Sequence, residues 1–173
     1  NIQYIQGDYY RELSEENTVK NDTIFSNRGN IYASDGNLLA TSMYKYTIRM
    51  DLIAIRSTVF EKSITDLSNS LSELLGNSSS YYQKKLRDAR KRKNRYLLIA
   101  RNLGYNDYMK MRQFPIFKLG PYKGGFITEQ KSVRVKPIGK IAARTIGYDD
   151  YRGGAGIEGA FTKYLEGENG WRL

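Results

Sequence analysis

The sequence predicts an α+β fold in which strands and helices are mixed irregularly and form no βαβ series. Residues 44–52 alternate apolar and polar side chains, which is typical of a half-buried strand. Residues 60–75 carry apolar side chains at alternating steps of four and three, which indicates an amphipathic helix. Asp35 and Gly36 separate two short apolar groups, and this dipeptide favours a β-hairpin.

The residues before and within the predicted strand are of two kinds. The first 24 residues are polar and acidic around Glu12, Glu15 and Glu16, lack a clear period, and are expected to lead into the hairpin. Within the strand, every second residue is apolar and is expected to face the core. These core-facing residues are Tyr44, Tyr46, Ile48, Met50 and Leu52.

Two helices are expected after the strand. Thr58 and Glu61 have the spacing of a capping box for the first helix, and Gly76 is its expected end. Residues 78–80 are serines, which favour an N-cap. A strongly basic second helix is therefore expected over residues 81–93.

The elements that follow are shorter. The apolar run at residues 96–100 is either a buried strand or a continuation of the basic helix, because periodicity does not separate the two. A short polar helix over residues 106–112 is expected to end before Pro115. Glycine and proline predict a loop at residues 120–125, and residues 126–135 are expected to form another strand.

Composition excludes several kinds of chemistry. The chain has no cysteine, which removes disulfides and thiolate catalysis, and no histidine, which removes the usual general base and the commonest transition-metal ligand. We expect no catalytic, cofactor-binding or metal-binding residues. The longest wholly apolar run, residues 96–100, is far shorter than the ~20 residues of a membrane span. Because the chain starts at Asn1 without a signal peptide, we interpret it as part of a longer protein.

The net charge of +10 is concentrated in the basic segment, residues 84–95. Three interpretations are open: a solvated helix face, a contact for acidic groups of a partner protein or of anionic lipid headgroups, and a contact for nucleic-acid phosphates beside Tyr81, Tyr82 and Tyr96. The candidate partner-binding residues are Lys84, Lys85, Arg87, Arg90, Lys91, Arg92, Lys93 and Arg95. A basic, tyrosine-rich module that binds nucleic acid or another polyanion is therefore the alternative function.

Two short motifs resemble catalytic or cofactor signatures without the structural setting these need. Ser42 and Lys45 match Ser-x-x-Lys, but this pair works on a helix, and on a strand the two side chains point to opposite faces. Residues 154–159 spell G-x-G-x-x-G, but the residues before them are too polar for the buried strand that a dinucleotide site requires. A glycine turn that enters a helix is the expected structure there.

Two glycine-rich stretches near the C-terminus have local physical reasons. Pro137 lacks a backbone donor and biases the residue before it toward extended geometry, so it ends the strand at residues 126–135. Gly156 opens a short helix with Glu158 in the first turn, where a negative charge suits the helix dipole. The apolar residues of this helix are spaced by four and are expected on one face: Ile157, Phe161 and Leu165.

Taken in order, the three stretches at residues 28–40, 134–147 and 156–170 resemble the N-terminal pedestal of class B penicillin-binding proteins. The resemblance is nearest to the cell-division transpeptidase of Bacteroides- and Flavobacterium-like bacteria. The motif residues that carry it are Arg28, Gly29, Asp35, Gly36, Leu39, Ala40, Arg134, Pro137, Gly139, Gly147, Gly156, Glu158, Leu165, Gly167 and Gly170.

The resemblance implies an elongated, non-catalytic pedestal. It implies three parts: residues 1–59 with the leading segment, hairpin and strand, a helical insert at 60–125, and residues 126–173 completing the pedestal. The implied location is the periplasmic face of the bacterial inner membrane, with an N-terminal membrane helix as anchor. The implied partners are a membrane glycosyltransferase, other division proteins and the protein's own transpeptidase domain; a homodimer is left open, and nucleic acid is not expected.

The three stretches also predict one specific contact. Each contains an ionisable residue beside glycine or close to proline, namely Arg28, Arg134 and Glu158. If the stretches form one compact module, Glu158 is expected to pair with one or both arginines, partly shielded from water. The alternative is three independent surface charges.

Overall fold

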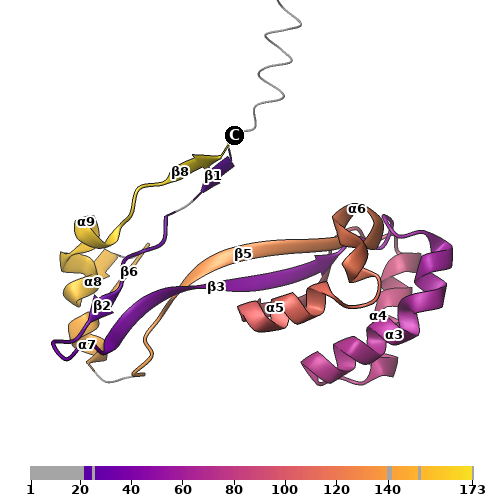
Figure 1. Cartoon of the computed structure of the whole chain (residues 1–173), viewed down its shortest axis with the longest axis horizontal. Coiled ribbons are helices and arrows are strands. Elements are labelled where there is room, and N and C mark those ends of the chain that lie inside the picture. Colours follow the sequence, from indigo (N-terminus) through magenta and orange to yellow (C-terminus); the bar gives the residue numbers. More distant parts are fainter. Residues whose placement is uncertain (1–21, 25, 140–141, 152, 173) are drawn as a thin grey trace, which may run out of the picture. The chain divides into compact units, whose positions relative to one another are not determined.

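The computed structural model describes residues 22–24, 26–139, 142–151 and 153–172. The chain forms two compact units, residues 1–42 with 134–173 (unit 1) and residues 43–133 (unit 2). The α+β class predicted from the sequence is confirmed (Figure 1). The acidic leading segment lies almost entirely outside the described residues.

Unit 2 is built on β3 (Leu38–Met50), β4 (Leu97–Leu103) and β5 (Phe126–Val135). Strand β4 runs antiparallel to β3, with Tyr46 opposite Leu103 and Met50 opposite Leu97, and β5 also pairs with β3. The apolar run at residues 96–100 is therefore strand and not helix.

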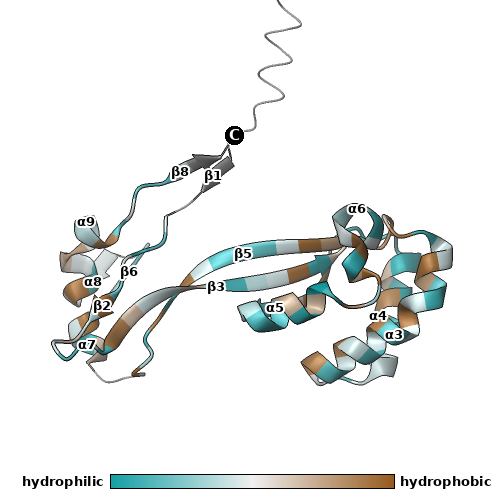
Figure 2. Ribbon diagram, viewed as in Figure 1, coloured by the Kyte–Doolittle hydropathy of each residue, from teal (hydrophilic) through white to brown (hydrophobic). Residues whose placement is uncertain are grey.

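The helices of unit 2 are α3 (Ser57–Leu75), α4 (Ser79–Lys91), α5 (Tyr105–Arg112), the 3-10 helix η1 (Phe117–Leu119) and α6 (Gly120–Gly124). Helices α3 and α4 lie side by side, and apolar and polar residues alternate along both (Figure 2). The predicted loop at 120–125 is wrong, because residues 120–124 close one short helical turn.

The core of unit 2 confirms most of the predicted pattern. The apolar side of α3 is buried, as are the inward residues of β3 from Tyr46 onward; Tyr44 is 38% exposed and does not belong to the core. The fully buried large side chains are Ile48, Met50, Leu52, Ile55, Phe60, Ile64, Leu67, Leu71, Leu86, Met111, Ile116 and Phe117.

The predicted end of α3 and the serine cap of α4 are confirmed, whereas α4 covers residues 79–91 and not the predicted 81–93. Gly76 ends α3 in the left-handed conformation at φ 84°, and the Ser78 hydroxyl accepts a hydrogen bond from the backbone of Tyr81 at the start of α4. The predicted capping box is wrong. Helix α3 begins at Ser57 after Arg56, which gives no side-chain cap, so Thr58 already lies inside the first turn.

Unit 1 contains β1 (Asp22–Ile24), β2 (Ile31–Tyr32), α7 (Ala143–Ile146), β6 (Tyr148–Asp150), β7 (Gly153–Ala155), α8 (Gly156–Ala160), α9 (Thr162–Leu165) and β8 (Gly170–Arg172). Strand β1 pairs with β8, β6 with β7, and β2 with the first residues of β3, all antiparallel. The predicted hairpin is thus present, with Gly36 at φ 82° in its turn.

The predicted helix at residues 156–165 is interrupted. Phe161 has φ −107° and ψ 22° and separates α8 from α9. Ile157 and Leu165 pack against the buried cluster of Ile31, Ala40 and Ile146, whereas Phe161 is 51% exposed. The break turns Phe161 away from the face that its spacing predicted.

Candidate functional site

A buried charge cluster in unit 1 joins residues that are distant in the sequence. Arg28 lies just before β2, Arg134 near the end of β5, and Glu158 in the first turn of α8. Glu158 is 2% exposed, and the side chains of the two arginines are 18% and 20% exposed. An ionised carboxylate this deeply buried requires charged or hydrogen-bonded partners.

Each carboxylate oxygen of Glu158 accepts from a different arginine. Nε of Arg28 lies 2.7 Å from Oε2, and Nε of Arg134 lies 2.7 Å from Oε1. Nη2 of Arg28 also donates to the backbone carbonyl of Glu158 at 2.7 Å. The predicted pairing of Glu158 with both arginines is confirmed.

Further hydrogen bonds connect the cluster to its surroundings. Nη1 of Arg28 lies 3.0 Å from a carboxylate oxygen of Asp149, and the Thr162 hydroxyl donates to the same oxygen at 2.7 Å. On the other side, the Ser42 hydroxyl donates to the carbonyl of Arg28 at 3.0 Å and accepts from Nη1 of Arg134 at 3.2 Å. The hairpin, β6 and α8 are thereby fixed to one another within unit 1.

A cavity of about 400 Å³ borders the cluster. It is lined by Arg28, Arg134, Lys136, Gly147, Tyr148, Asp149 and Glu158. Nζ of Lys136 donates to the carbonyl of Gly147 at 2.6 Å. Nη2 of Arg134 is buried and has no hydrogen-bond partner among the described residues.

The side chains around Glu158 are arranged for structure and not for nucleophilic catalysis. The Ser42 hydroxyl donates to a backbone carbonyl and has no base beside it among the described residues, since its neighbour in the cluster is a guanidinium. Ser42 and Lys45 also lie an odd number of residues apart in β3, so their side chains point to opposite faces.

The other motif residues lie around the charge cluster and beyond it. The backbone N–H of Gly29 donates to the carbonyl of Leu165 at 2.7 Å, and Leu39 and Ala40 belong to the apolar cluster beneath it. Gly147 has φ 73°, and a Cβ there would lie 1.8 Å from the carbonyl oxygen of Ala155. Beyond the cluster lie the hairpin turn (Asp35, Gly36), the exposed Pro137 and Gly139, the start of α8 (Gly156), and the segment after α9 (Gly167, Gly170).

Comparison with known proteins now decides the family. A family model of the penicillin-binding protein dimerisation domain matches residues 23–173. The chain belongs to this family. Among curated protein sequences, none matches this dimerisation domain.

Two solved structures resemble the dimerisation domain. Penicillin-binding protein 2X from Streptococcus thermophilus matches with TM-score 0.65 and 22% identity over 89% of this chain and 25% of its own. A peptidoglycan synthetase from Bifidobacterium adolescentis matches with TM-score 0.48 and 19% identity over 88% of this chain and 30% of its own. The first likeness shows the fold, and the chain spans about a quarter of the length of that protein.

The basic segment of the dimerisation domain is only partly a solvated face. Lys84, Lys91, Arg92 and Lys93 are exposed. Arg90 instead donates to the carbonyls of Leu52 at 2.6 Å and Ile55 at 3.0 Å, and its guanidinium lies 4.6 Å from the centre of the Phe60 ring. The interpretation of the segment as a solvated helix face is therefore wrong for Arg90.

The other members of the segment also differ in their surroundings. Arg87 forms an ion pair with Glu61 at 2.7 Å, Nζ of Lys85 lies 5.8 Å from the Tyr81 ring centre, and Arg95 lies 3.9 Å from Asp51. Of the three tyrosines considered as stacking platforms, Tyr82 is buried, whereas Tyr96 is 54% exposed although its hydroxyl donates to Glu129.

Sequence reasoning missed three members of the charge cluster. Asp149 had no predicted contact, but its side chain is 22% exposed and pairs with Arg28. Thr162 and Ser42 had no assigned contact to the arginines. Thr162 follows Glu158 by four residues in the predicted helix, and residues at this spacing lie on the same helix face. This spacing was the sequence signal that could have placed Thr162 beside Glu158.

Proposed function

We propose that the chain is the non-catalytic pedestal of a bacterial peptidoglycan transpeptidase, which it holds away from the membrane. The family match over residues 23–173 supports a pedestal module, and the buried Glu158 carries the mechanical part of the proposal. Two arginines from segments 106 residues apart hold one carboxylate, which makes unit 1 a firmly connected support. Among the described residues, no helix is long and apolar enough to cross a membrane.

The finer parts of the proposal concern the parent protein. We propose a cell-division transpeptidase of a Bacteroides- or Flavobacterium-like bacterium, anchored by an N-terminal helix at the periplasmic face of the inner membrane. Its pedestal would have three parts. Residues 1–59 would form the leading segment, hairpin and strand, residues 60–125 a helical insert, and residues 126–173 the segment that completes the pedestal. Its partners would be the membrane glycosyltransferase, other division proteins and its own transpeptidase domain, with a homodimer as a further association.

The exposed part of the basic segment is the proposed contact for division proteins. Four basic side chains are exposed on the surface of unit 2, so acidic groups of a partner could reach them: Lys84, Lys91, Arg92 and Lys93. Their replacement should weaken a partner's association, chiefly through a slower association rate that also depends on salt.

The test uses the full-length parent protein in its own cells. Glu158→Ala should reduce septal peptidoglycan synthesis, while a fluorescent penicillin still labels the catalytic serine of the parent. Glu166→Ala is the matched control, because Glu166 is 65% exposed and lies 3.9 Å from Arg28, which also contacts Glu158. Normal septa in the Glu158→Ala cells, with the protein present at normal abundance, would refute the supporting role of the cluster.

The alternative function, binding of nucleic acid or another polyanion, has a separate test. Its support is charge: 18 of the 28 basic residues but only 7 of the 18 acidic residues lie in unit 2. Phosphate binding would give an affinity for DNA or RNA that falls steeply with added salt. We favour the pedestal because the family model matches residues 23–173 and because Tyr82, one of the three tyrosines near the basic segment, is buried.

A further inference from the structure

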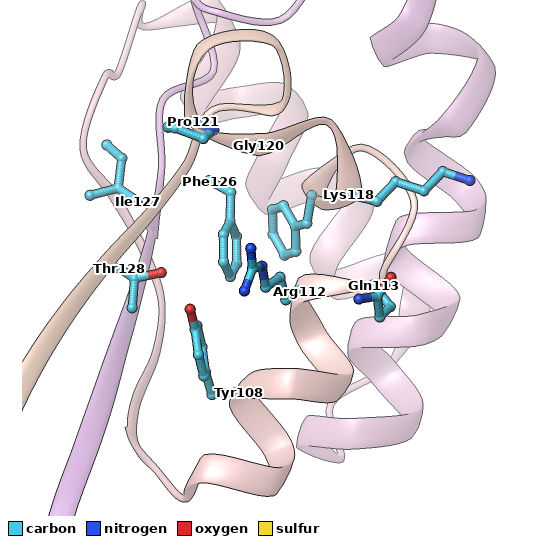
Figure 3. A pocket seen from close by; sticks show the side chains of 10 residues that line it. Tyr108, Arg112, Gln113, Lys118, Gly120, Pro121, Phe126, Ile127 and Thr128 are labelled. Carbon is cyan, nitrogen blue, oxygen red and sulfur yellow. The ribbon is translucent and has the colours of Figure 1, made fainter.

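Unit 2 contains a second cavity, which the charge cluster and the basic segment do not include. It encloses about 620 Å³ between α5, the η1–α6 segment and the beginning of β5. Figure 3 shows the rings of Tyr108 and Phe126 and the guanidinium of Arg112 directed toward the same space. The remaining lining residues are Gln113, Phe117, Lys118, Gly120, Pro121, Ile127 and Thr128.

Stacked aromatic rings form the floor of this cavity. The Tyr108 ring lies 4.3 Å from the Tyr46 ring at an angle of 7°, and 6.3 Å from the Phe126 ring at 14°. The Phe117 ring lies 4.9 Å from that of Phe126. The lining residues Phe117 and Phe126 are buried, and the buried Tyr46 stacks on Tyr108, so the floor is preformed and can receive an apolar or aromatic side chain with little reorganisation.

The cavity reaches an unpaired edge of the sheet. In the part of the chain that the structure describes, β5 pairs with β3 alone, which leaves its other edge without a strand. Three consecutive residues of β5, Phe126 to Thr128, line the cavity. The cavity therefore lies beside this part of β5, where backbone N–H and C=O groups of an unpaired edge can pair with an added strand.

The residue directly before one wall of the cavity has an uncommon backbone conformation. Ile116, directly before η1, has φ 69° and ψ −52°, which is rare and strained for a β-branched residue. Ile116 is 2% exposed and does not itself line the cavity, whereas Leu119 and Tyr122, which flank the lining residues Gly120 and Pro121, are 42% and 90% exposed. The wall thus presents apolar side chains to solvent beside the cavity, as protein-binding surfaces do.

Charge selects the kind of occupant. Arg112 and Lys118 line the cavity and are exposed, and no lining residue is acidic. The whole of unit 2 carries 18 basic and 7 acidic residues, so a second copy of this unit would bring like charges together. An acidic segment of another protein pairs with the exposed cations and avoids the repulsion between two basic units.

We propose that this cavity and the free edge of β5 bind an extended acidic segment of a partner protein. The segment adds to β5 as a strand, inserts one apolar or aromatic side chain against Tyr108 and Phe126, and places carboxylates beside Arg112 and Lys118. Main-chain hydrogen bonds provide affinity, and the cavity and the two cations provide specificity. This surface does not depend on the parent enzyme or on Glu158.

The test measures binding of a short fluorescent peptide to the full chain by anisotropy and locates it by amide resonances. The probe alternates valine and glutamate around one central tryptophan. We expect the amide shifts at residues 126–130, and binding about tenfold weaker for three control peptides. These carry lysine for glutamate, glutamate for tryptophan, or N-methyl groups at alternate positions.

Matched variants separate this surface from the basic helix. Arg112→Glu combined with Lys118→Glu should lower the affinity for the probe peptide by at least about tenfold, because charge-assisted contacts are lost and like charges are introduced. Lys84→Glu combined with Lys91→Glu makes the same change in charge on α4. This pair should change the affinity for the probe peptide by less than about threefold. Circular dichroism of both pairs verifies the fold.

Several outcomes would overturn the proposal. These are no binding at about 1 mM peptide, amide shifts on α4 in place of β5, and equal competition by an RNA oligonucleotide or polyglutamate, which would mean a general polyanion surface. A dimer of the chain whose interface maps to β5 would mean that a second copy occupies the edge. None of these outcomes bears on the pedestal function, which the Glu158→Ala cells test separately.

Discussion

Arg28 contacts Glu158 at two points, the carboxylate oxygen Oε2 and the backbone carbonyl, both at 2.7 Å. The first contact neutralises the side chain, and the second fixes the helix that carries it. Because the other carboxylate oxygen accepts from Arg134, the position of α8 depends on two segments from opposite halves of the sequence. Unit 1 is therefore closed by a charge network as well as by its small apolar cluster.

Glu158→Ala is expected to lower the free energy of unfolding by about 3–5 kcal/mol, because it leaves two partly buried guanidinium groups facing each other. Urea unfolding followed by circular dichroism measures the change. Glu166→Ala, at an exposed carboxylate near the same arginine, should cost less than about 1 kcal/mol. A cost below about 1 kcal/mol for Glu158→Ala would mean that the cluster does not hold unit 1 together.

The basic segment should divide into packed and free members. Arg90→Gln is expected to cost about 2–3 kcal/mol, since it removes hydrogen bonds to two backbone carbonyls and the contact with Phe60. Lys91→Gln and Arg92→Gln should each change the free energy of unfolding by less than about 0.5 kcal/mol. Thermal unfolding of the three variants measures this; equal effects at all three positions would contradict the division.

Gly125 should tolerate no side chain. It has φ 62°, and a Cβ would lie 2.0 Å from the carbonyl oxygen of Asp51, whose own N–H donates to the Gly125 carbonyl. Gly36 has φ 82° and open space around it, so Gly36→Ala isolates the conformational cost of about 1–2 kcal/mol. Gly125→Ala should exceed that cost clearly in a chemical denaturation experiment. Similar losses in the two variants would show that the backbone at residue 125 shifts freely.

The contact between Tyr96 and Glu129 should make stability depend on pH at both ends of the scale. The hydrogen bond from Tyr96, aided by Arg49, holds the pKa of Glu129 below its ordinary 4.5. The same bond, with desolvation and the negative charge of Glu129, raises the pKa of Tyr96 above 10.0. The first stabilisation is present above the unfolded pKa of glutamate and lost as pH falls through the folded value. The second is present below the unfolded pKa of tyrosine and lost as pH rises through the folded value.

Tyr96→Phe removes both contributions. The difference in the free energy of unfolding between the wild type and Tyr96→Phe should be largest between about pH 5 and 9 and shrink on either side. Tyr122→Phe, the same substitution at a tyrosine that is 90% exposed, serves as the control. A difference that is constant from about pH 3 to 8 would contradict the assigned pKa of Glu129.

The chain is expected to form no covalent adduct with a fluorescent β-lactam. Ser42 has a guanidinium and a backbone carbonyl as partners, and Lys45 faces the other side of β3. Denaturing electrophoresis after incubation measures the adduct, with a penicillin-labelled transpeptidase as positive control. A fluorescent band that disappears in Ser42→Ala would show that this hydroxyl is reactive after all.

Local sequence determined the elements whose causes are local. The alternation in β3, the apolar side of α3, Gly76 at φ 84° and the serine cap of α4 each depend on neighbours within a few residues, and their periods or backbone preferences can be read directly. The pairing of Glu158 with Arg28, Arg134 or both was also predicted, on the condition that the three stretches form one compact module, as the resemblance implies.

Tertiary structure decided what depends on residues far apart in the chain. Residues 97–103 form a strand because β3 offers a pairing edge, which no local period reveals. Arg90 of α4 is packed because it donates to the carbonyls of Leu52 and Ile55, which lie between β3 and α3. Asp149 joins the cluster because β6 lies beside Arg28. Identical side chains in a basic or acidic run differ in burial only once the fold places partners next to some and water next to others.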